Sequence, residues 1–259
     1  MQGLAGRVAL VTGGSSGLGE AIVYRLAREG VNVAVGGRDA VKTARVVSAA
    51  AVAARDAGHS ADFSTALGDV ACVADCERLV AETIARHGRL DILVNSAGVW
   101  LEKSILETTE QDWESCVGIC LKGTYFMCKH AIAHMVTRKS GVIVNVASDS
   151  GIHGEPGAAV YSAAKAGVIM MTRALAIDHG PDGIRVCSVA PGVFDTPMLA
   201  KAIAGAPDPA TYADGMEDAY PLKRIGRPEE LAATVAFLAS DEASFITGRT
   251  IVIDGGVTA

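Results

Sequence analysis

A tyrosine and a lysine stand four residues apart in the alanine-rich stretch AAVYSAAKAG, residues 158–167. Alanine favours helix, and in a helix this spacing places Tyr161 and Lys165 on one face, one turn apart. A phenol can pass a proton, and a neighbouring ammonium group favours its ionised form. The same pair also occurs on solvated helix surfaces. The elements around the pair therefore decide whether it does chemistry.

Short apolar runs alternate with longer helical stretches along the chain. The expected strands are residues 8–12, 31–35, 63–67, 90–95, 142–147, 185–189 and 250–253. The expected helices are residues 17–29, 39–57, 74–87, 109–137, 158–179 and 228–239. Nearly continuous apolar strands suit a parallel sheet covered on both faces, and the alternation indicates βαβ crossovers. We predict an α/β fold: a Rossmann-type, doubly wound parallel sheet of seven strands with helices on both faces.

Composition restricts the classes of function. Half of the 259 residues are apolar (50%), enough for a sizeable core, and no linker divides the chain, so we predict one domain over residues 1–259. A net charge of -6 argues against nucleic acid as a partner. No apolar run approaches the ~18 residues that span a bilayer, and the N-terminus lacks the pattern of a signal peptide. We expect a cytoplasmic protein that binds no membrane.

Cysteine and histidine give no sign of a metal site. The six cysteines form no CxxC pair, and without a secretion signal free thiols are the default. His130 and His134 lie four residues apart, but Ala131 stands where an HExxH motif has glutamate. We interpret the two histidines as part of a helix surface and predict no bound metal.

The stretch ALVTGGSSGLGEAI, residues 9–22, follows the first expected strand and opens the first helix. Glycines there allow a tight turn, and they let backbone N–H groups and the helix N-terminus approach a pyrophosphate. The position directly after the first strand raises this pattern above a common glycine-rich turn. The expected cofactor contacts in this loop are Thr12, Gly13, Ser15, Ser16, Gly17, Leu18 and Gly19.

The end of the second strand bears on the choice between NAD and NADP. Gly37 stands where an acid would hold the ribose 2′-hydroxyl of NAD, and Arg38 follows it. A guanidinium group pairs with a 2′-phosphate, so the sequence favours NADP(H) and leaves NAD(H) as the alternative. In a competing interpretation Arg38 is only solvent-exposed, and Asp39 caps the next helix.

Two further segments are expected beside the cofactor. Asp69 follows the third strand and is predicted, with Val70, to contact the adenine; the alternative role of Asp69 is to cap the next helix. The small residues of NSAG, residues 95–98, close the fourth strand and let the chain pass near the adenosine. The contacts expected there are Asn95, Ala97 and Gly98.

Ser148 lies 13 residues before Tyr161, at the end of the fifth expected strand. With the glycine loop, the NSAG segment, Ser148, Tyr161 and Lys165 in this order, the sequence resembles the short-chain dehydrogenase/reductase family. The resemblance runs from Val8 to Gly256 and includes APGVFDTPM, GRPEELA and FITGRTIVIDGG. Each motif is modest alone, whereas together, in order and at family spacing, they are highly specific.

The resemblance implies an enzyme that moves a hydride between a nicotinamide cofactor and a secondary alcohol or ketone. In that reading Tyr161 is the general acid or base, Lys165 lowers the pKa of the phenol and holds the nicotinamide ribose, and Ser148 binds the substrate oxygen. The residues implied beside the nicotinamide carboxamide are Pro191, Gly192, Val193 and Thr196. Thr196 also suits a local turn before Pro197.

The resemblance further implies a homotetramer built on helices 109–137 and 158–179 and on the C-terminal strand region. The apolar positions of these helices are explained equally well by core packing. One departure bears on activity: Cys120, in GICLKGTY, replaces an asparagine thought to hold a water that connects the lysine to solvent. A thiol is a poor substitute. Either Cys120 packs as a small apolar side chain, or the protein is a cofactor-binding sensor or scaffold with little turnover.

Substrate contacts are the least determined part of the sequence. Residues 192–221, rich in glycine, proline and aspartate, are expected to form a flexible loop over the site. The acids of this loop disfavour a strongly anionic substrate. The candidate substrate contacts are His153, Glu155, Phe194 and Met198.

Overall fold

The molecule is built on one sheet of parallel strands, and the computed structural model describes residues 1–206 and 208–259. The strands are β1 (Val8–Thr12), β2 (Asn32–Gly37), β3 (Phe63–Leu67), β4 (Ile92–Asn95), β5 (Gly141–Val146), β6 (Ile184–Pro191) and β7 (Thr250–Ile253). Their order is β3-β2-β1-β4-β5-β6-β7, and every pairing is parallel. The predicted seven-stranded, doubly wound sheet is confirmed.

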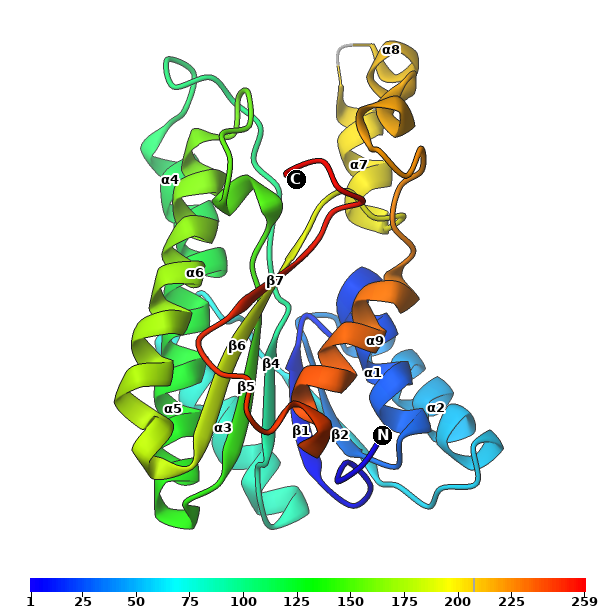
Figure 1. Cartoon of the computed structure of the whole chain (residues 1–259), viewed down its shortest axis with the longest axis vertical. Helices are drawn as coiled ribbons and strands as arrows, with labels where there is room; N and C mark the ends of the chain where they lie inside the picture. The colour runs from blue at the N-terminus through cyan, green and yellow to red at the C-terminus, as the bar shows by residue number, and fades with distance from the viewer. Residues whose placement is uncertain (207) are drawn as a thin grey trace.

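Helices cover both faces of this sheet (Figure 1). They are α1 (Gly17–Arg28), α2 (Ala40–Asp56), α3 (Val73–His87), α4 (Glu110–Val117), α5 (Thr124–Arg138), α6 (Ala159–His179), α7 (Pro197–Gly205), α8 (Pro209–Ala213) and α9 (Pro228–Ala239). Helices α1, α2 and α9 form one layer, and α3 to α6 form the other (Figure 1). Helices α7 and α8 stand beyond the ends of the strands.

The alternation of side chains along β1 shows how the two cores form. Ala9 and Val11 pack into the core that includes Ile22 of α1, whereas Leu10 packs into the core that includes Met127 of α5. All these side chains are fully buried. Because both faces of β1 are covered by helices, an uninterrupted apolar strand is the pattern that the fold requires.

The strand order places a crevice at one point of the sheet. The chain moves outward from β1 through β2 to β3 and then returns to β4 on the other side of β1. The connections after β1 and β4 therefore diverge at the carboxyl ends of these neighbouring strands. Ligands of open α/β sheets bind at such a switch in strand order.

Two expected elements differ from the structure. The helix expected over residues 109–137 is interrupted by a π-helical turn at Gly118–Gly123, between α4 and α5. The expected loop 192–221 holds α7, α8 and a 3-10 turn at Met216–Ala219. Both helices in this segment begin at a threonine or aspartate cap followed by proline, a pattern that starts a helix. The flexibility of this segment stays a prediction.

One described helix, Ala159–Asp182, is long and apolar enough by composition to cross a bilayer, with a mean hydropathy of 1.2. From the sequence, no apolar run long enough to span a bilayer is expected. In the structure the helix belongs to the core: Val168 and Ile169 are buried and pack with Ala147, which follows β5. Its apolar composition is accounted for by this packing.

Candidate active site

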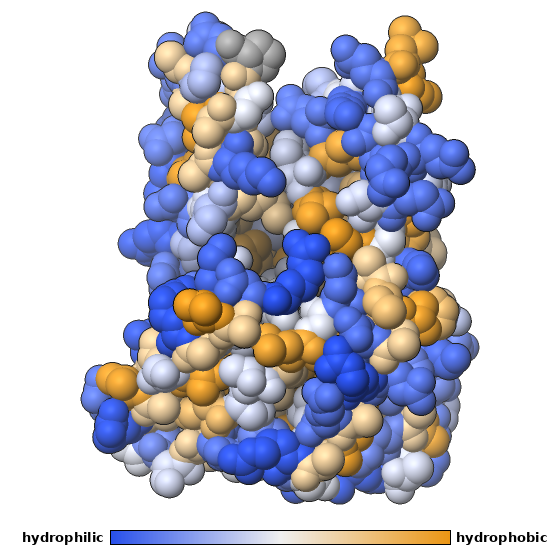
Figure 2. Space-filling view, turned by 180° about the vertical axis from the view of Figure 1, so that it is seen from behind, coloured by the Kyte–Doolittle hydropathy of each residue, from blue (hydrophilic) through white to orange (hydrophobic). Residues whose placement is uncertain are grey.

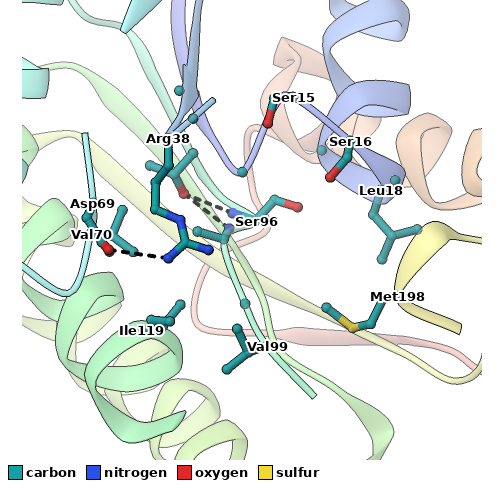
Figure 3. Close-up of a pocket in the computed structure, with 18 of the residues that line it drawn as sticks. Ser15, Ser16, Leu18, Arg38, Asp69, Val70, Ser96, Val99, Ile119 and Met198 are labelled. Carbon is teal, nitrogen blue, oxygen red and sulfur yellow. Dashed lines mark hydrogen bonds and ion pairs between the residues drawn. The ribbon is translucent and has the colours of Figure 1, made fainter. Parts of the chain in front are cut away.

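A cavity of about 230 Å³ lies at the carboxyl ends of β1, β2 and β4 (Figure 3). Nearly all the residues expected to bind cofactor before residue 100 line it: Thr12, Gly13, Ser15, Ser16, Gly17, Leu18, Gly19, Arg38, Asp69, Val70, Ala97 and Gly98. Thr196 and Met198 close it from the far side. The folded chain thus brings these five separate segments of the sequence to one site.

The turn after β1 leaves no room for side chains at two glycines. A Cβ on Gly19 would lie 2.2 Å from the carbonyl oxygen of Gly13, and one on Gly13 would lie 2.8 Å from the backbone nitrogen of Ala97. The turn therefore stays close to the neighbouring backbone and opens α1 directly onto the cavity. The first N–H groups of a helix lack partners within it and favour an anion, so the turn fits a pyrophosphate group.

Thr12 fixes the opposite wall of the same cavity. Its hydroxyl accepts hydrogen bonds from the backbone N–H groups of Ser96 and Ala97, at 3.2 and 3.3 Å (Figure 3). Asn95, in contrast, turns its side chain into the sheet, where its amide donates to Asn145 at 2.9 Å. Asn95 is not among the described residues that line this cavity, and its expected cofactor contact stays a prediction.

Arg38 and Asp69 face each other across the cavity (Figure 3). The guanidinium group lies 3.4 Å from the Asp69 carboxylate, and both side chains are well exposed. Asp39 caps α2 by accepting from the backbone of Lys42, as the competing interpretation expected. That interpretation is incomplete, because Arg38 also lines the cavity. Asp69 does not cap α3, whose N-terminal cap is Cys72; it accepts instead from the backbone of Ala71.

A second cavity, of about 440 Å³, continues from the first. The residues that line both are Leu18, Ser96, Gly98, Thr196 and Met198. The space-filling view shows the molecule hollowed between its two upper prominences (Figure 2). Ser148, Tyr161 and Lys165 all line this second cavity, as do Pro191, Gly192 and Val193. The Tyr–Lys pair is therefore placed inside a site and not on a solvated surface.

The three predicted catalytic side chains are all buried. Lys165 donates to the carbonyl oxygen of Val146 at 2.8 Å, and its Nζ lies 5.6 Å from the centre of the Tyr161 ring. Ser148 follows β5 and donates its hydroxyl to the Asp149 carboxylate at 3.0 Å. Helix α6 thus presents the phenol and the ammonium group beside the end of a central strand.

The pKa of Tyr161 is raised in the protein alone. Burial raises it most, Cys120 and Asp149 raise it further, and hydrogen bonding with Ser148 acts in the opposite direction. Burial likewise lowers the pKa of Lys165. The lowering of the phenol pKa by Lys165 together with a bound oxidised nicotinamide stays a prediction, because in the protein alone burial has the largest effect on both side chains. The phenol is therefore protonated at neutral pH and suited to donate a proton.

Cys120 lies in the π-helical turn and is 1% exposed. Its sulfur lies 3.5 Å from both the backbone nitrogen and the carbonyl oxygen of Val99. Hydrogen bonding with Cys116 lowers the pKa of Cys120, and the nearby Lys165 lowers it as well. The thiol therefore links the helix to the segment after β4, which is the packing role that the sequence left open. All six cysteines are free, as predicted.

Three of the four expected substrate contacts line the second cavity: Glu155, Phe194 and Met198. His153 is not among its described lining residues. The Nδ1 atom of His153 lies 3.1 Å from the Gly154 carbonyl oxygen, and its Nε2 lies 3.7 Å from Asp149. The imidazole of His153 therefore lies close to Asp149, and Asp149 is the one of the two that lines the cavity. Phe194 is buried to 5% exposure, and its ring lies against Gly226.

Sequence reasoning missed several residues of this cavity. The missed side chains that make specific contacts are Trp100, Glu102, Asp149, Tyr212 and Tyr220. Trp100 meets Tyr161 edge to face, with ring centres 4.8 Å apart. Tyr220, at the far end of the 192–221 segment, accepts a hydrogen bond from the backbone N–H of Val193 with its hydroxyl oxygen. No local motif marks these residues, because they meet only once distant segments have folded together.

Comparisons with known proteins agree with this geometry. Residues 13–258 match the family model described as enoyl-(acyl carrier protein) reductase. The chain is 41% identical to a cis-4-hydroxycyclohexanecarboxylate dehydrogenase of Sinomonas cyclohexanicum, over 100% of this chain and 99% of that one. It is 40% identical to a meso-2,3-butanediol dehydrogenase of Serratia marcescens, over 98% and 95% of the two chains.

A solved structure of levodione reductase superposes with a TM-score of 0.92, at 35% identity and with 97% of each chain covered. The sequence matches and this superposition extend over nearly the whole chain. They coincide with the region that carries the glycine turn, the Tyr–Lys pair and the shared cavities. The protein is an oxidoreductase that belongs to the short-chain dehydrogenase/reductase family.

Proposed function

We propose that this protein transfers a hydride between NADP(H) and a secondary alcohol or its ketone. The observation that carries the proposal is the continuity of the two cavities. A ligand bound in the first cavity can extend past the residues that line both cavities. Its far end then lies beside Ser148, Tyr161 and Lys165 in the second cavity. A bound nicotinamide supplies or accepts the hydride, which is chemistry that protein side chains lack.

The chain's own residues handle the proton and the substrate oxygen. In reduction, the carbonyl carbon gains a hydride and its oxygen gains the proton of the Tyr161 hydroxyl. Oxidation runs the same steps in reverse, with Tyr161 accepting the proton of the alcohol. Ser148 lies next to the phenol and orients the oxygen, while Lys165 holds its position through the Val146 carbonyl. Burial raises the pKa of Tyr161 and so favours the acid form, which is the form that donates the proton in reduction.

The preference for NADP(H) rests on the end of β2. Gly37 offers no carboxylate to a ribose 2′-hydroxyl, and Arg38 lines the cavity next to it. The Arg38–Asp69 pair is exposed, and exposed ion pairs contribute little, so the guanidinium group is free to turn toward a 2′-phosphate. Ser15 adds a hydroxyl group on the facing side of the cavity. NAD(H) is the alternative cofactor.

A panel of ketones and alcohols, followed by nicotinamide absorbance with NADPH and NADH in parallel, tests the proposal. The panel includes acetoin and cyclic ketones with and without a carboxylate, since relatives are named for meso-2,3-butanediol and cis-4-hydroxycyclohexanecarboxylate. We expect turnover with NADPH above that with NADH. Saturable cofactor binding without turnover across the panel would favour the sensor or scaffold that the Cys120 substitution suggested.

We also propose that the protein assembles as a homotetramer through α4, α5 and α6. The support is a set of large apolar or aromatic side chains exposed on these helices: Trp113, Tyr125, Met170 and Ile177. Scattered exposed apolar residues are normal on a protein surface, whereas several on one helix layer favour a contact between copies. Light scattering at micromolar concentration measures the mass; a monomer would contradict this proposal and leave the enzymatic one intact.

A further inference from the structure

The second cavity has an unusual balance of charge for a site that binds small molecules. Its described lining contains three carboxylates, those of Glu102, Asp149 and Glu155, and one ammonium group, that of Lys165. The acids come from two segments, one after β4 and one after β5. They are not the acids of the 192–221 segment, none of which is among the described lining residues.

The single ammonium group is committed to other partners. Lys165 is 4% exposed and donates to the Val146 carbonyl oxygen at 2.8 Å. It lies beneath the Tyr161 ring, at the end of the cavity where hydride and proton are exchanged. A negative charge at the opposite end of a substrate would therefore meet the carboxylates without a compensating cation.

The carboxylates surround the space that the body of a substrate would occupy. Asp149 is buried next to Ser148 and accepts from the backbone of Ser150 at 2.8 Å. Glu102 accepts from the indole N–H of Trp100 at 3.1 Å and from the hydroxyl of Tyr212, on α8, at 3.0 Å. Both acids therefore have hydrogen-bond donors within the protein.

Glu155 lies half-buried in the cavity wall. Burial and the charge of Asp149 raise its pKa. In the described part of the chain no donor pairs with its carboxylate, in contrast to Asp149 and Glu102. A half-buried carboxylate without a donor is stabilised by a hydrogen-bond donor on a ligand, and it repels a second negative charge.

We propose that this cavity selects alcohols and ketones whose far end is uncharged or cationic and donates a hydrogen bond, and that it rejects those with a carboxylate or phosphate there. Glu155 is the main specificity-determining residue, and Glu102, next to Gly157 in the same part of the wall, adds its charge. The proposal rests on the proposed hydride transfer and adds the charge of the substrate to it. Selection by like-charge repulsion is a common device of specific sites.

Three matched ketones test this proposal: para-(hydroxymethyl)acetophenone, para-(aminomethyl)acetophenone and para-acetylbenzoate. They share one rigid skeleton and differ in the charge of the far group. Each is measured as a substrate with NADPH; any that is not reduced is measured as a competitive inhibitor of the best ketone of the panel. We expect kcat/KM, or the reciprocal of the inhibition constant, to be about 30-fold higher for the hydroxymethyl compound than for the carboxylate.

The variant Glu155→Gln keeps the shape of the side chain and removes its charge. We expect it to narrow that ratio about five-fold, chiefly by improving the use of the carboxylate compound. Glu77→Gln, on the exposed side of α3, removes the same charge away from the cavity and leaves the ratio unchanged.

The outcomes separate the two proposals. Equal or better use of para-acetylbenzoate by the parent protein, or an unchanged ratio in Glu155→Gln, would overturn the charge selection while hydride transfer stands. Reduction of no ketone, in this series or in the panel, would overturn the proposed function itself, and charge selection in catalysis falls with it.

Discussion

The first cavity, proposed to hold the cofactor, and the second, proposed to hold the substrate, share lining residues. They differ in whether backbone or side chains give them their shape. Backbone shapes the first: at Gly13 and Gly19 a single added carbon would meet main-chain atoms. Buried side chains shape the second, and Tyr161 and Lys165 have pKa values there that are set first by burial. The first cavity is therefore sensitive to added volume, and the second to changes in charge and proton affinity.

This difference explains how one fold can keep its cofactor while its substrate changes. Backbone N–H groups and tight turns depend on the sheet and on α1, which the core holds in place. The substrate cavity draws walls from the segment after β4, from α7 and from α8, which lie outside that core. Substitutions there alter the charge and shape of the site without disturbing the strands.

Removing the ammonium group should give the largest effect. We expect Lys165→Met to lower kcat/KM by about 10³-fold, because the phenol loses its charged neighbour and the cofactor loses a contact. Steady-state kinetics on the best ketone measures the change. Lys42→Met, at an exposed position of α2, serves as the control. A loss of less than ten-fold would show that Lys165 is only a packing residue.

Reversing the charge at the adenosine end should change which cofactor is used. We expect Arg38→Asp to shift the NADP/NAD ratio of kcat/KM by about 100-fold toward NAD, because a carboxylate repels a 2′-phosphate. The control Arg55→Asp makes the same charge change at an exposed site on α2. An unaltered ratio would contradict the role given to Arg38.

Adding one carbon to the glycine turn tests the backbone half of the comparison. We expect Gly19→Ala to weaken cofactor binding about 30-fold, since its Cβ would overlap the carbonyl of Gly13 and displace the turn. Fluorescence titration with NADPH measures the dissociation constant. Gly180→Ala, where no atom lies within 4 Å of the added carbon, should bind as the parent does. Parent-like affinity in Gly19→Ala would refute the close approach.

The smallest effect is expected at Cys120. We predict that Cys120→Asn changes kcat by less than about three-fold, because the thiol already pairs with the Val99 backbone. The pH profile of kcat is measured for both proteins, with Cys120→Ala as a third. A large gain in rate, with a shifted profile for the asparagine variant alone, would mean that the thiol limits proton transfer in the parent.

Local patterns in the sequence predicted the strands and the glycine turn, and they were enough to propose Ser148, Tyr161 and Lys165 as the catalytic set. Tyr161 and Lys165 are four residues apart on one helix, so their proximity needs no knowledge of tertiary structure. Trp100 and Tyr212 could not be found in the same way, since they reach the cavity from segments more than 100 residues apart in the chain.

Two other differences have specific causes. The π-helical turn at Gly118–Gly123 has the same apolar periodicity as the helices on either side of it, so the sequence indicated one unbroken helix. The starts of α7 and α8 did carry a signal: Thr196 precedes Pro197, and Asp208 precedes Pro209. A cap followed by proline at the first helical position indicates a helix start. The high glycine and proline content of residues 192–221 nevertheless led us to predict a loop there.

The central claim is that the Tyr161 hydroxyl passes the proton that accompanies hydride transfer. Tyr161→Phe tests it most directly, in single-turnover reduction of the best ketone with bound NADPH. The account predicts that the hydride-transfer rate falls by at least about 10³-fold while the dissociation constant of NADPH stays within about two-fold of the parent value. A phenylalanine variant that transfers hydride at the parent rate would contradict it.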